Sequence, residues 1–312
     1  MYVSFYAKIL NSNNINRSIY INLFTIKCEK FKNLTANLEY DSSNDIYKFK
    51  DNTDFKEYCT DENCNSDLDN ISAGCLYLFG AFFGSSSSFN SVAKRNTNIV
   101  DYILIWLSYM LNYKRMNEND SIEPFYEIFI NKYSKYNKGN KDNKYNEKIR
   151  DVTDYESYKD LIDKKQNLIS IYVKDMSKFY DAFILLCGMY IEFETNSYCD
   201  NCLEKAKSFV ETYDELNEDY NNGKGSPYNQ LLSTLSNDYN NLKNKCNHFP
   251  SLPTYSRRLV IKMTLIPIAF IFVAVSIFFG IAYKYSLLGF RKRSQKQCLR
   301  EKIKNIKKRM NK

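Results

Sequence analysis

The sequence is poor in the residue types on which most catalytic and metal sites depend. It contains one histidine, His248, and one tryptophan among 312 residues. Histidine titrates near neutral pH and is a frequent zinc ligand, so a single copy argues against His-based acid–base catalysis and His-rich metal sites. Glycine (nine) and proline (five) are also scarce. Both have GC-rich codons, which indicates a contribution from genomic base composition.

Acidic residues are almost absent from the C-terminal end. Residues 284–312 contain 12 basic side chains and one acidic, Glu301, a charge of +11, whereas the whole chain has a formal net charge of +8. The other 283 residues hold 32 basic and 35 acidic side chains, or −3. A protein that coats nucleic acid spreads positive charge over its folded part. This distribution therefore argues against nucleic acid as a partner.

One hydrophobic run is long enough to cross a bilayer. Residues 263–283 (MTLIPIAFIFVAVSIFFGIAY) contain no charged side chain. As a helix they reach roughly 30 Å, the thickness of the hydrocarbon layer. The apolar runs Tyr102–Leu111 and Phe179–Ile191 are too short to span, and Asp181 interrupts the second. The sequence therefore predicts one membrane helix at residues 263–283, in preference to a buried core helix.

The flanking charges predict the orientation of this helix. Arg257, Arg258 and Lys262 precede it, and the much more basic residues 284–312 follow it. Because the more basic flank of a membrane helix stays in the cytosol, we expect a cytosolic tail and an ectodomain on the other side, joined to the span by a stalk at residues 251–262. The N-terminus shows no signal-peptide pattern, so we expect the membrane helix itself to direct insertion.

The cysteines agree with this topology. Eight precede the span and one, Cys298, follows it. An even number outside and a single thiol inside are typical of an oxidised ectodomain and a reducing cytosol. The disulfide candidates are Cys28, Cys59, Cys64, Cys75, Cys187, Cys199, Cys202 and Cys246. Eight cysteines allow roughly a hundred pairings, and the sequence does not choose among them.

Two alternatives to disulfides remain open for these cysteines. Cys59-x4-Cys64 and Cys199-x2-Cys202 have the spacing of zinc half-sites. Zinc binding would require deprotonated thiols in a reducing compartment, which the topology disfavours. The other alternative is that some cysteines stay reduced and buried.

Apolar spacing predicts a helical ectodomain over residues 28–250. Asn98 and Asp101 resemble a capping box before apolar residues that recur at helical spacing to Leu111. Phe179–Ile191 is a second strongly apolar helix candidate, and Tyr198–Tyr220 and Tyr228–Cys246 show the weaker periodicity of exposed bundle helices. The predicted fold class is mainly α: a disulfide-linked helical ectodomain, one transmembrane helix and a short basic amphipathic tail.

Polar segments and isolated motifs give no catalytic, cofactor or metal site. Lys135–Asp151 and Asn217–Pro227 are typical of loops. Gly84–Ser88 is rich in glycine and serine but lacks the Lys-Ser/Thr of a phosphate-binding loop. Asp67 and Asp69 indicate a capped helix start before an apolar stretch. His248, between the last ectodomain cysteine and Pro250, is interpreted as a stalk residue, and we expect no enzyme.

The tail predicts an amphipathic helix. After Ser294, a candidate N-cap, the apolar residues Leu299, Ile303, Ile306 and Met310 follow at spacings of four, three and four. A basic amphipathic helix beside a span binds anionic lipid, with about 1 kcal/mol from each Lys or Arg. The expected inner-leaflet contacts are Lys284, Arg291, Lys292, Arg293, Lys296, Arg300, Lys302, Lys304, Lys307, Lys308 and Arg309.

Two alternatives to lipid contact by the tail remain open. The tail could dock on an acidic cytoplasmic or cytoskeletal partner, or it could serve only to set the topology. Cys298 borders the apolar stripe and is a candidate palmitoylation site.

Two long segments resemble one known family. Asp67–Asn112 (DLDNISAGCLYLFGAFFGSSSSFNSVAKRNTNIVDYILIWLSYMLN) is similar to the signature block of the PIR proteins, the Plasmodium interspersed repeat family of malaria parasites. Tyr283–Met310 (YKYSLLGFRKRSQKQCLREKIKNIKKRM) resembles the cytoplasmic tail of the same family. Family members usually begin a few residues before the first cysteine, here Cys28. Residues 1–27 therefore resemble an N-terminal extension, and their composition suggests an unspliced intron or a misplaced start.

The resemblance implies a variant surface antigen of a parasite that lives inside red cells. It implies antigenic variation, immune evasion and contact with a host-cell receptor or antibody through a disulfide-stapled helical ectodomain. It also implies a place in the infected erythrocyte membrane or in a parasite or vacuolar membrane. A structural protein that organises membrane or cytoskeleton through its basic tail is the alternative.

Overall fold

The computed structural model describes residues 21–41, 43, 46–50, 53–59, 64–83, 98–113, 120–132, 157–196, 199–219, 221–253 and 266–310. The chain divides into two units, one ending at Pro253 and one beginning at Thr254, and each is described by itself. The expected loops at Gly84–Ser88 and Lys135–Asp151 lie outside the described residues, as do residues 1–20.

Two apolar helices form the centre of the first unit. They are α5 (Ile99–Tyr113) and α11 (Phe179–Asn196), where the two short apolar runs predicted helices. In α5 nearly every residue is buried, because α3 (Asp67–Phe83), α10 (Val173–Ser177) and α11 all contact it. Trp106 of α5 is 1% exposed and lies against Gly74 of α3, where a Cβ would come within 2.7 Å of the ring.

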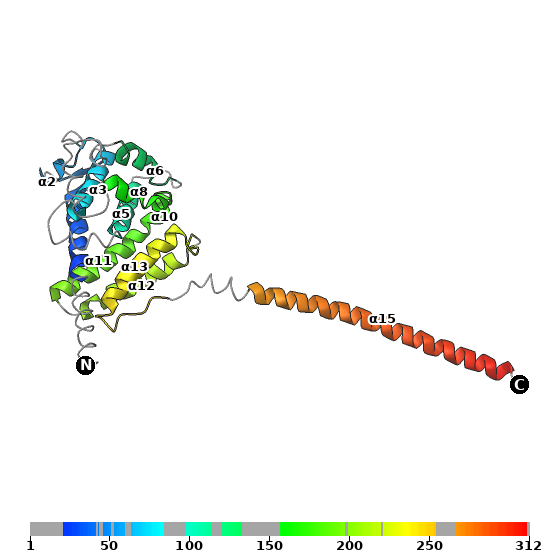
Figure 1. Ribbon diagram of the computed structural model, residues 1–312. Helices are drawn as coiled ribbons and strands as arrows, with labels where there is room; N and C mark the ends of the chain where they lie inside the picture. Colours follow the sequence, from blue (N-terminus) through cyan, green and yellow to red (C-terminus); the bar gives the residue numbers. More distant parts are fainter. Residues whose placement is uncertain are drawn as a thin grey trace, which may run out of the picture. The chain divides into compact units, whose positions relative to one another are not determined.

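The other helices pack around this centre. α12 (Leu203–Asn217) and α13 (Pro227–Lys243) contact α11 and each other, as Figure 1 shows. Each buries one apolar stripe and exposes charges on the opposite face, which explains their weaker sequence periodicity. The remaining helical segments are α2 (Thr53–Lys56), α6 (Glu123–Phe125), η2 (Tyr126–Ile130), α8 (Tyr158–Asp163), α9 (Gln166–Ile169) and η3 (Asp200–Cys202).

Helix starts follow their local sequence. At α3, the Ser66 hydroxyl accepts a hydrogen bond from the Asp69 N–H at 3.1 Å, and the Asp69 carboxylate accepts one from the Ser66 N–H at 3.1 Å. This reciprocal pair is a capping box, so the predicted capped start is confirmed. At α13, Ser226 caps the Asn229 N–H, with Pro227 in the first position of the helix.

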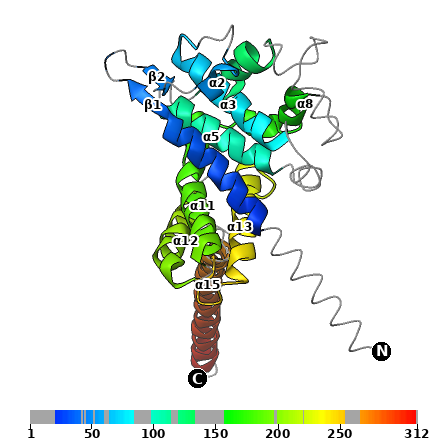
Figure 2. The ribbon, with the colours of Figure 1, turned by 90° about the vertical axis from the view of Figure 1, so that its left-hand side faces the viewer.

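The strands described are two short ones. β1 (Leu38–Asp41) and β2 (Ile46–Phe49) pair antiparallel, with Tyr40 opposite Tyr47. In Figure 2 this hairpin directly follows the first described helix, residues 21–37, which we call the N-terminal helix.

The N-terminal helix crosses the boundary that the sequence suggested at residue 28. Its residues Ile21, Leu23 and Phe24 are at most 8% exposed and belong to the same core as Cys28 and Phe31. The expected boundary therefore divides a single helix. Its apolar residues fall on one face at helical spacing, but the Asn-rich stretch just before them conceals this pattern.

The described part of the second unit is one helix, α15 (Ile266–Met310), of 45 residues. It contains a segment long and apolar enough to cross a membrane, and it continues without interruption through the basic tail. Ser294 therefore lies inside the helix and is not an N-cap, which corrects the expectation of a separate tail helix. The reason is that the intervening residues contain no proline and many good helix formers such as Lys, Arg and Gln.

Candidate functional site

Three disulfides connect parts of the first unit, at sequence separations from 5 to 159. Cys28–Cys187 joins the N-terminal helix to α11 over a sequence separation of 159. Cys199–Cys246 joins the segment before α12 to the segment after α13, and Cys59–Cys64 closes a short loop between α2 and α3. Their Cα–Cα distances of 5.1–5.5 Å are ordinary for disulfides.

The structure corrects the expected set of eight disulfide cysteines to six. Cys75 and Cys202 lie outside the three disulfides, and both are buried. Cys202 donates to the Met189 carbonyl at 3.6 Å, and its burial, with the nearby Glu192, raises the pKa of its thiol. Both side chains are packed in the hydrophobic core, whereas the other six cysteines pair with one another.

The two zinc-like spacings have different outcomes in the structure. The sulfurs of Cys59 and Cys64 are bonded to each other. Cys199 bonds to Cys246, whereas Cys202 is directed into the core. Within the described residues, no group of three or more His, Cys, Asp or Glu side chains is arranged to hold a metal ion.

A buried ion pair links three helical segments. Asp101 in α5 is 0% exposed, and its Oδ1 lies 2.6 Å from Nζ of Lys165, beside α9. Its Oδ2 accepts a hydrogen bond from the Thr234 hydroxyl of α13 at 3.1 Å. Burial raises the pKa of Asp101, while the Lys165 charge and the two contacts oppose this shift. Asp101 thus joins the start of α5 to residues far along the chain.

A second buried polar cluster surrounds Asp238 of α13. The Tyr102 hydroxyl donates to its carboxylate, and the Tyr190 hydroxyl donates to its backbone carbonyl at 2.7 Å. Lys27 of the N-terminal helix lies 5.8 Å from the centre of the Phe24 ring. Burial lowers the pKa of Lys27, and the charge of Asp238 opposes that shift. The cluster connects four helices, which suits a structural role.

Tyrosines form an exposed patch beside the hairpin. The patch consists of Tyr40, Tyr47 and Tyr113, whose ring centres lie 5.4–6.5 Å apart. Tyr40 and Tyr113 are 43% and 54% exposed. Burial, reinforced by the Tyr113 hydroxyl, raises the pKa of Tyr47 far above its ordinary value. The patch presents the aromatic rings of Tyr40 and Tyr113 to the solvent.

The comparisons with known proteins identify the family. A family model described as Plasmodium variant antigen protein Cir/Yir/Bir matches residues 28–284. The chain belongs to this family. The match begins at Cys28 and reaches the end of the apolar segment of α15, so it includes every disulfide of the first unit.

The fold of this variant antigen resembles a solved relative. A structure described as a Plasmodium PIR protein ectodomain matches with a TM-score of 0.56 and 28% sequence identity. The match covers 76% of this chain and 99% of that chain. No curated protein matches the chain. The family description is that of a variant antigen and names no enzyme.

The remaining predicted residues lie on α15 of this family member. The apolar residues of the stripe, Leu299, Ile303, Ile306 and Met310, are each at least 57% exposed. The eleven basic residues expected at the inner leaflet all belong to the same helix and are exposed, as is Cys298. Their contact with lipid stays a prediction.

His248, the expected stalk residue, lies near the packed end of the first unit. Its Nε2 is 3.6 Å from Oδ1 of Asp200, and the neighbouring Phe249 is 3% exposed. The Tyr239 hydroxyl also donates to the Pro250 carbonyl at 2.8 Å. The ordered unit thus includes this segment as far as Pro253.

Proposed function

We propose that this variant antigen is a single-pass membrane protein whose first unit lies outside the cytosol and whose basic tail lies inside. The observation that supports this most strongly is the division of chemistry by the apolar segment. All three disulfides precede it, and the exposed thiol Cys298 and the charge of +11 follow it. Disulfides persist in oxidising compartments, and basic flanks stay in the cytosol.

In this arrangement the first unit acts in antigenic variation, immune evasion and host-cell contact. Its partner is a host-cell receptor or an antibody, and the infected erythrocyte membrane, or a parasite or vacuolar membrane, carries it. The tyrosine patch supports a role in contact, because tyrosine is enriched at protein interfaces and supplies large contact area with few rotatable bonds.

Protease protection on intact infected cells tests the proposal. One antibody detects residues 284–312 and another detects the first unit. We expect external protease to remove the ectodomain signal and to leave a membrane-bound tail fragment. Permeabilised cells, in which both signals disappear, are the control. Complete protection of the ectodomain in intact cells would contradict surface exposure.

Host contact has its own test. Beads coated with the ectodomain should bind one class of host cell, and Tyr40→Ala with Tyr113→Ala should lower that binding at least tenfold. Tyr172→Ala is the matched control, because Tyr172 is 49% exposed and lies outside the patch. Equal loss with the control would argue against the patch.

The alternative function is organisation of membrane or cytoskeleton through the tail. It is supported by the exposed stripe from Leu299 to Met310 within a strongly basic helix. Contact of this stripe with the inner leaflet requires α15 to bend after the span, since the helix is continuous. Gly289 is a residue where such a bend meets little resistance. An acidic cytoskeletal partner would need no bend, so Gly289→Ala should weaken lipid contact only.

A further inference from the structure

A groove opens where the N-terminal helix meets α11. The two helices run antiparallel, as shown by the contacts from Asn22 to Glu194 at 3.3 Å and from Thr25 to the Tyr190 carbonyl at 3.3 Å. The Cys28–Cys187 disulfide joins them further along. The groove has a volume of about 550 Å³ beside this disulfide, within the range of small-molecule sites.

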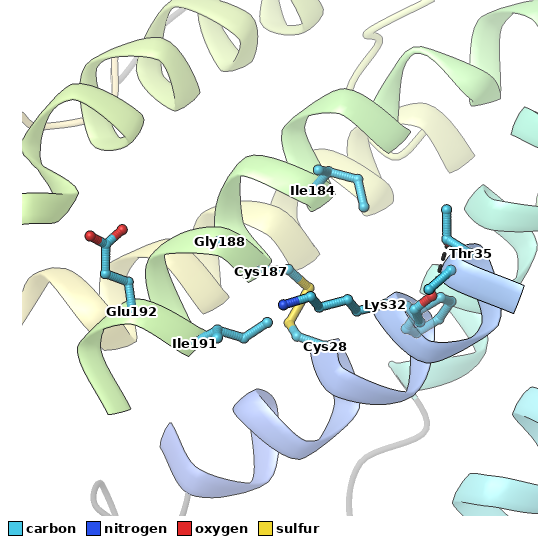
Figure 3. A pocket seen from close by; sticks show the side chains of 10 residues that line it. Cys28, Lys32, Thr35, Ile184, Cys187, Gly188, Ile191 and Glu192 are labelled. Carbon is cyan, nitrogen blue, oxygen red and sulfur yellow. Dashed lines mark hydrogen bonds between the residues drawn. A yellow bond between two sulfur atoms is a disulfide. The ribbon is translucent and has the colours of Figure 1, made fainter. Parts of the chain in front are cut away.

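The lining of the groove is mostly apolar. Ile184 and Ile191 of α11 line it together with Phe31 and Ala36 of the N-terminal helix. Figure 3 shows the two isoleucines on α11 near the disulfide. Ile184 is 43% exposed although it lies in the middle of α11. Gly188 adds no side chain at the centre of the groove, and the stem of Lys205 occupies the space beyond it. The result is an apolar channel that remains accessible to solvent.

The charges at the groove leave one cation available. Lys32 and Glu192 are the ionisable side chains of the lining that can carry a charge. Glu192 is paired with Lys205 of α12. Lys32 is exposed, forms no ion pair with any residue that the structure describes, and reaches across the disulfide in Figure 3, while Glu192 is directed away from it. The groove therefore combines an apolar channel with one unpaired positive charge.

We propose that this groove binds a single-chain anionic amphiphile, such as a fatty acid or a lysophospholipid. The hydrocarbon chain lies along Ile184, Gly188 and Ile191, and the anionic head pairs with Lys32. A bilayer that supplies such molecules is close, because only residues 254–265 separate the first unit from α15. Fully extended, that connection reaches at most ~45 Å. The inference holds for either orientation of the chain, but the supply from a nearby bilayer rests on the membrane span of the proposed function.

A fluorescent fatty acid tests the binding. The ectodomain, residues 1–253, is a suitable sample, because the solved relative is also an ectodomain and is matched over 99% of its length. Titration with 11-(dansylamino)undecanoate should give a saturable rise and blue shift in emission. Palmitate and 1-palmitoyl lysophosphatidate should displace the probe, whereas hexadecanol, which lacks the charge, should compete at least tenfold less well. Displacement by only one of the two anions identifies a carboxylate or a phosphate head.

Two variants test separately the part of the groove that holds the hydrocarbon chain of the ligand and the lysine that pairs with its anionic head. Ala36→Trp fills the groove and should weaken both anions at least tenfold. Lys32→Glu should weaken the anions at least tenfold and change hexadecanol less than twofold. Ile128→Trp, at a residue 50% exposed on η2, and Lys224→Glu, at an exposed loop lysine, are the matched controls and should change nothing. Circular dichroism and a count of free thiols establish that each variant is folded.

The proposal fails under any of three results. The first is that the emission of the probe does not saturate. The second is that binding survives Ala36→Trp in a folded protein. The third is that hexadecanol competes as well as palmitate, which would leave an apolar groove without head-group recognition.

Discussion

Replacing Lys165 by methionine is expected to destabilise the first unit strongly, because it leaves the Asp101 carboxylate buried without its counter-ion. Asp101 is 0% exposed and Lys165 is 8% exposed, and their charged atoms lie 2.6 Å apart. Methionine keeps most of the length and apolar volume of the lysine stem. The change therefore removes the charge and leaves the packing largely intact.

The expected loss can be estimated from this geometry. Breaking a buried ion pair from one side costs about 3–5 kcal/mol, since the remaining charge has lost its compensation. The Thr234 hydroxyl still donates to Asp101, which favours the lower end of that range. For a unit of this size the loss corresponds to a fall in Tm of about 10 °C. Adding Asp101→Leu should restore most of the stability, because the apolar pair leaves no buried charge.

The pH dependence gives an independent signature. Burial raises the pKa of Asp101 and the Lys165 charge opposes the shift, so Lys165→Met should raise this pKa further. A carboxyl whose pKa is higher in the folded than in the unfolded state destabilises the fold when it is ionised. The penalty is absent below the unfolded pKa of about 4, grows as pH rises from there to the folded pKa, and stays constant above it. The variant should therefore lose less stability at pH 5 than at pH 8.

Urea denaturation with the disulfides intact measures these differences. Lys164→Met is the matched control, since Lys164 is the exposed neighbour of Lys165, and it should shift the free energy of unfolding by less than about 0.5 kcal/mol. A loss below about 1 kcal/mol for Lys165→Met, or a loss that does not depend on pH, would refute the reasoning.

Three further predictions concern the disulfides, the core and the tail. Removing Cys28–Cys187, which closes the longest loop, should destabilise the unit by up to about 5 kcal/mol, whereas removing Cys59–Cys64 should cost about 2 kcal/mol. Urea denaturation of the paired Cys→Ala variants measures both losses. A larger loss for Cys59–Cys64 would contradict the chain-entropy argument. Gly74→Ala should cost about 1–3 kcal/mol and shift the fluorescence emission of Trp106, the only tryptophan, because the new Cβ comes within 2.7 Å of its ring. Gly223→Ala is the control and should do neither, because Gly223 has open space around it. Changing Lys307, Lys308 and Arg309 to Gln should weaken binding of the tail peptide 284–312 to anionic vesicles by about 3 kcal/mol. Vesicle flotation measures this binding, and neutral vesicles are the control. Unchanged binding would favour a protein partner.

Continuous apolar runs made the central helices predictable. Apolar stretches of the sequence coincide with α5, with most of α11 and with the first part of α15. Their composition alone indicates that the first two are buried and that the third is long and apolar enough to cross a membrane. The capped start of α3 was also predictable, because a capping box involves only residues within one turn. Local chemistry is visible in a sequence when all its participants are neighbours.

Features that depend on distant contacts could not be read from the sequence. Cys28 pairs with Cys187 because the N-terminal helix packs antiparallel on α11, 159 residues later. Asp101 stands three residues after Asn98, where a cap is expected, and only the folded chain brings Lys165 to it. The groove likewise forms from small residues of two helices, Ala36 and Gly188, which have no relation in the sequence.

The arrangement of bonds explains how a variant antigen can change its surface and keep its fold. The strongest constraints do not depend on exposed side chains: three disulfides, the buried Asp101–Lys165 pair and the buried Asp238 cluster hold parts of the fold together. Substitutions at exposed positions away from such features usually change stability by less than about 0.5 kcal/mol. Exposed residues such as Tyr40 and Tyr113 can therefore differ between family members without unfolding the frame. The disulfides widen this tolerance, because each adds stability that does not depend on the exposed side chains.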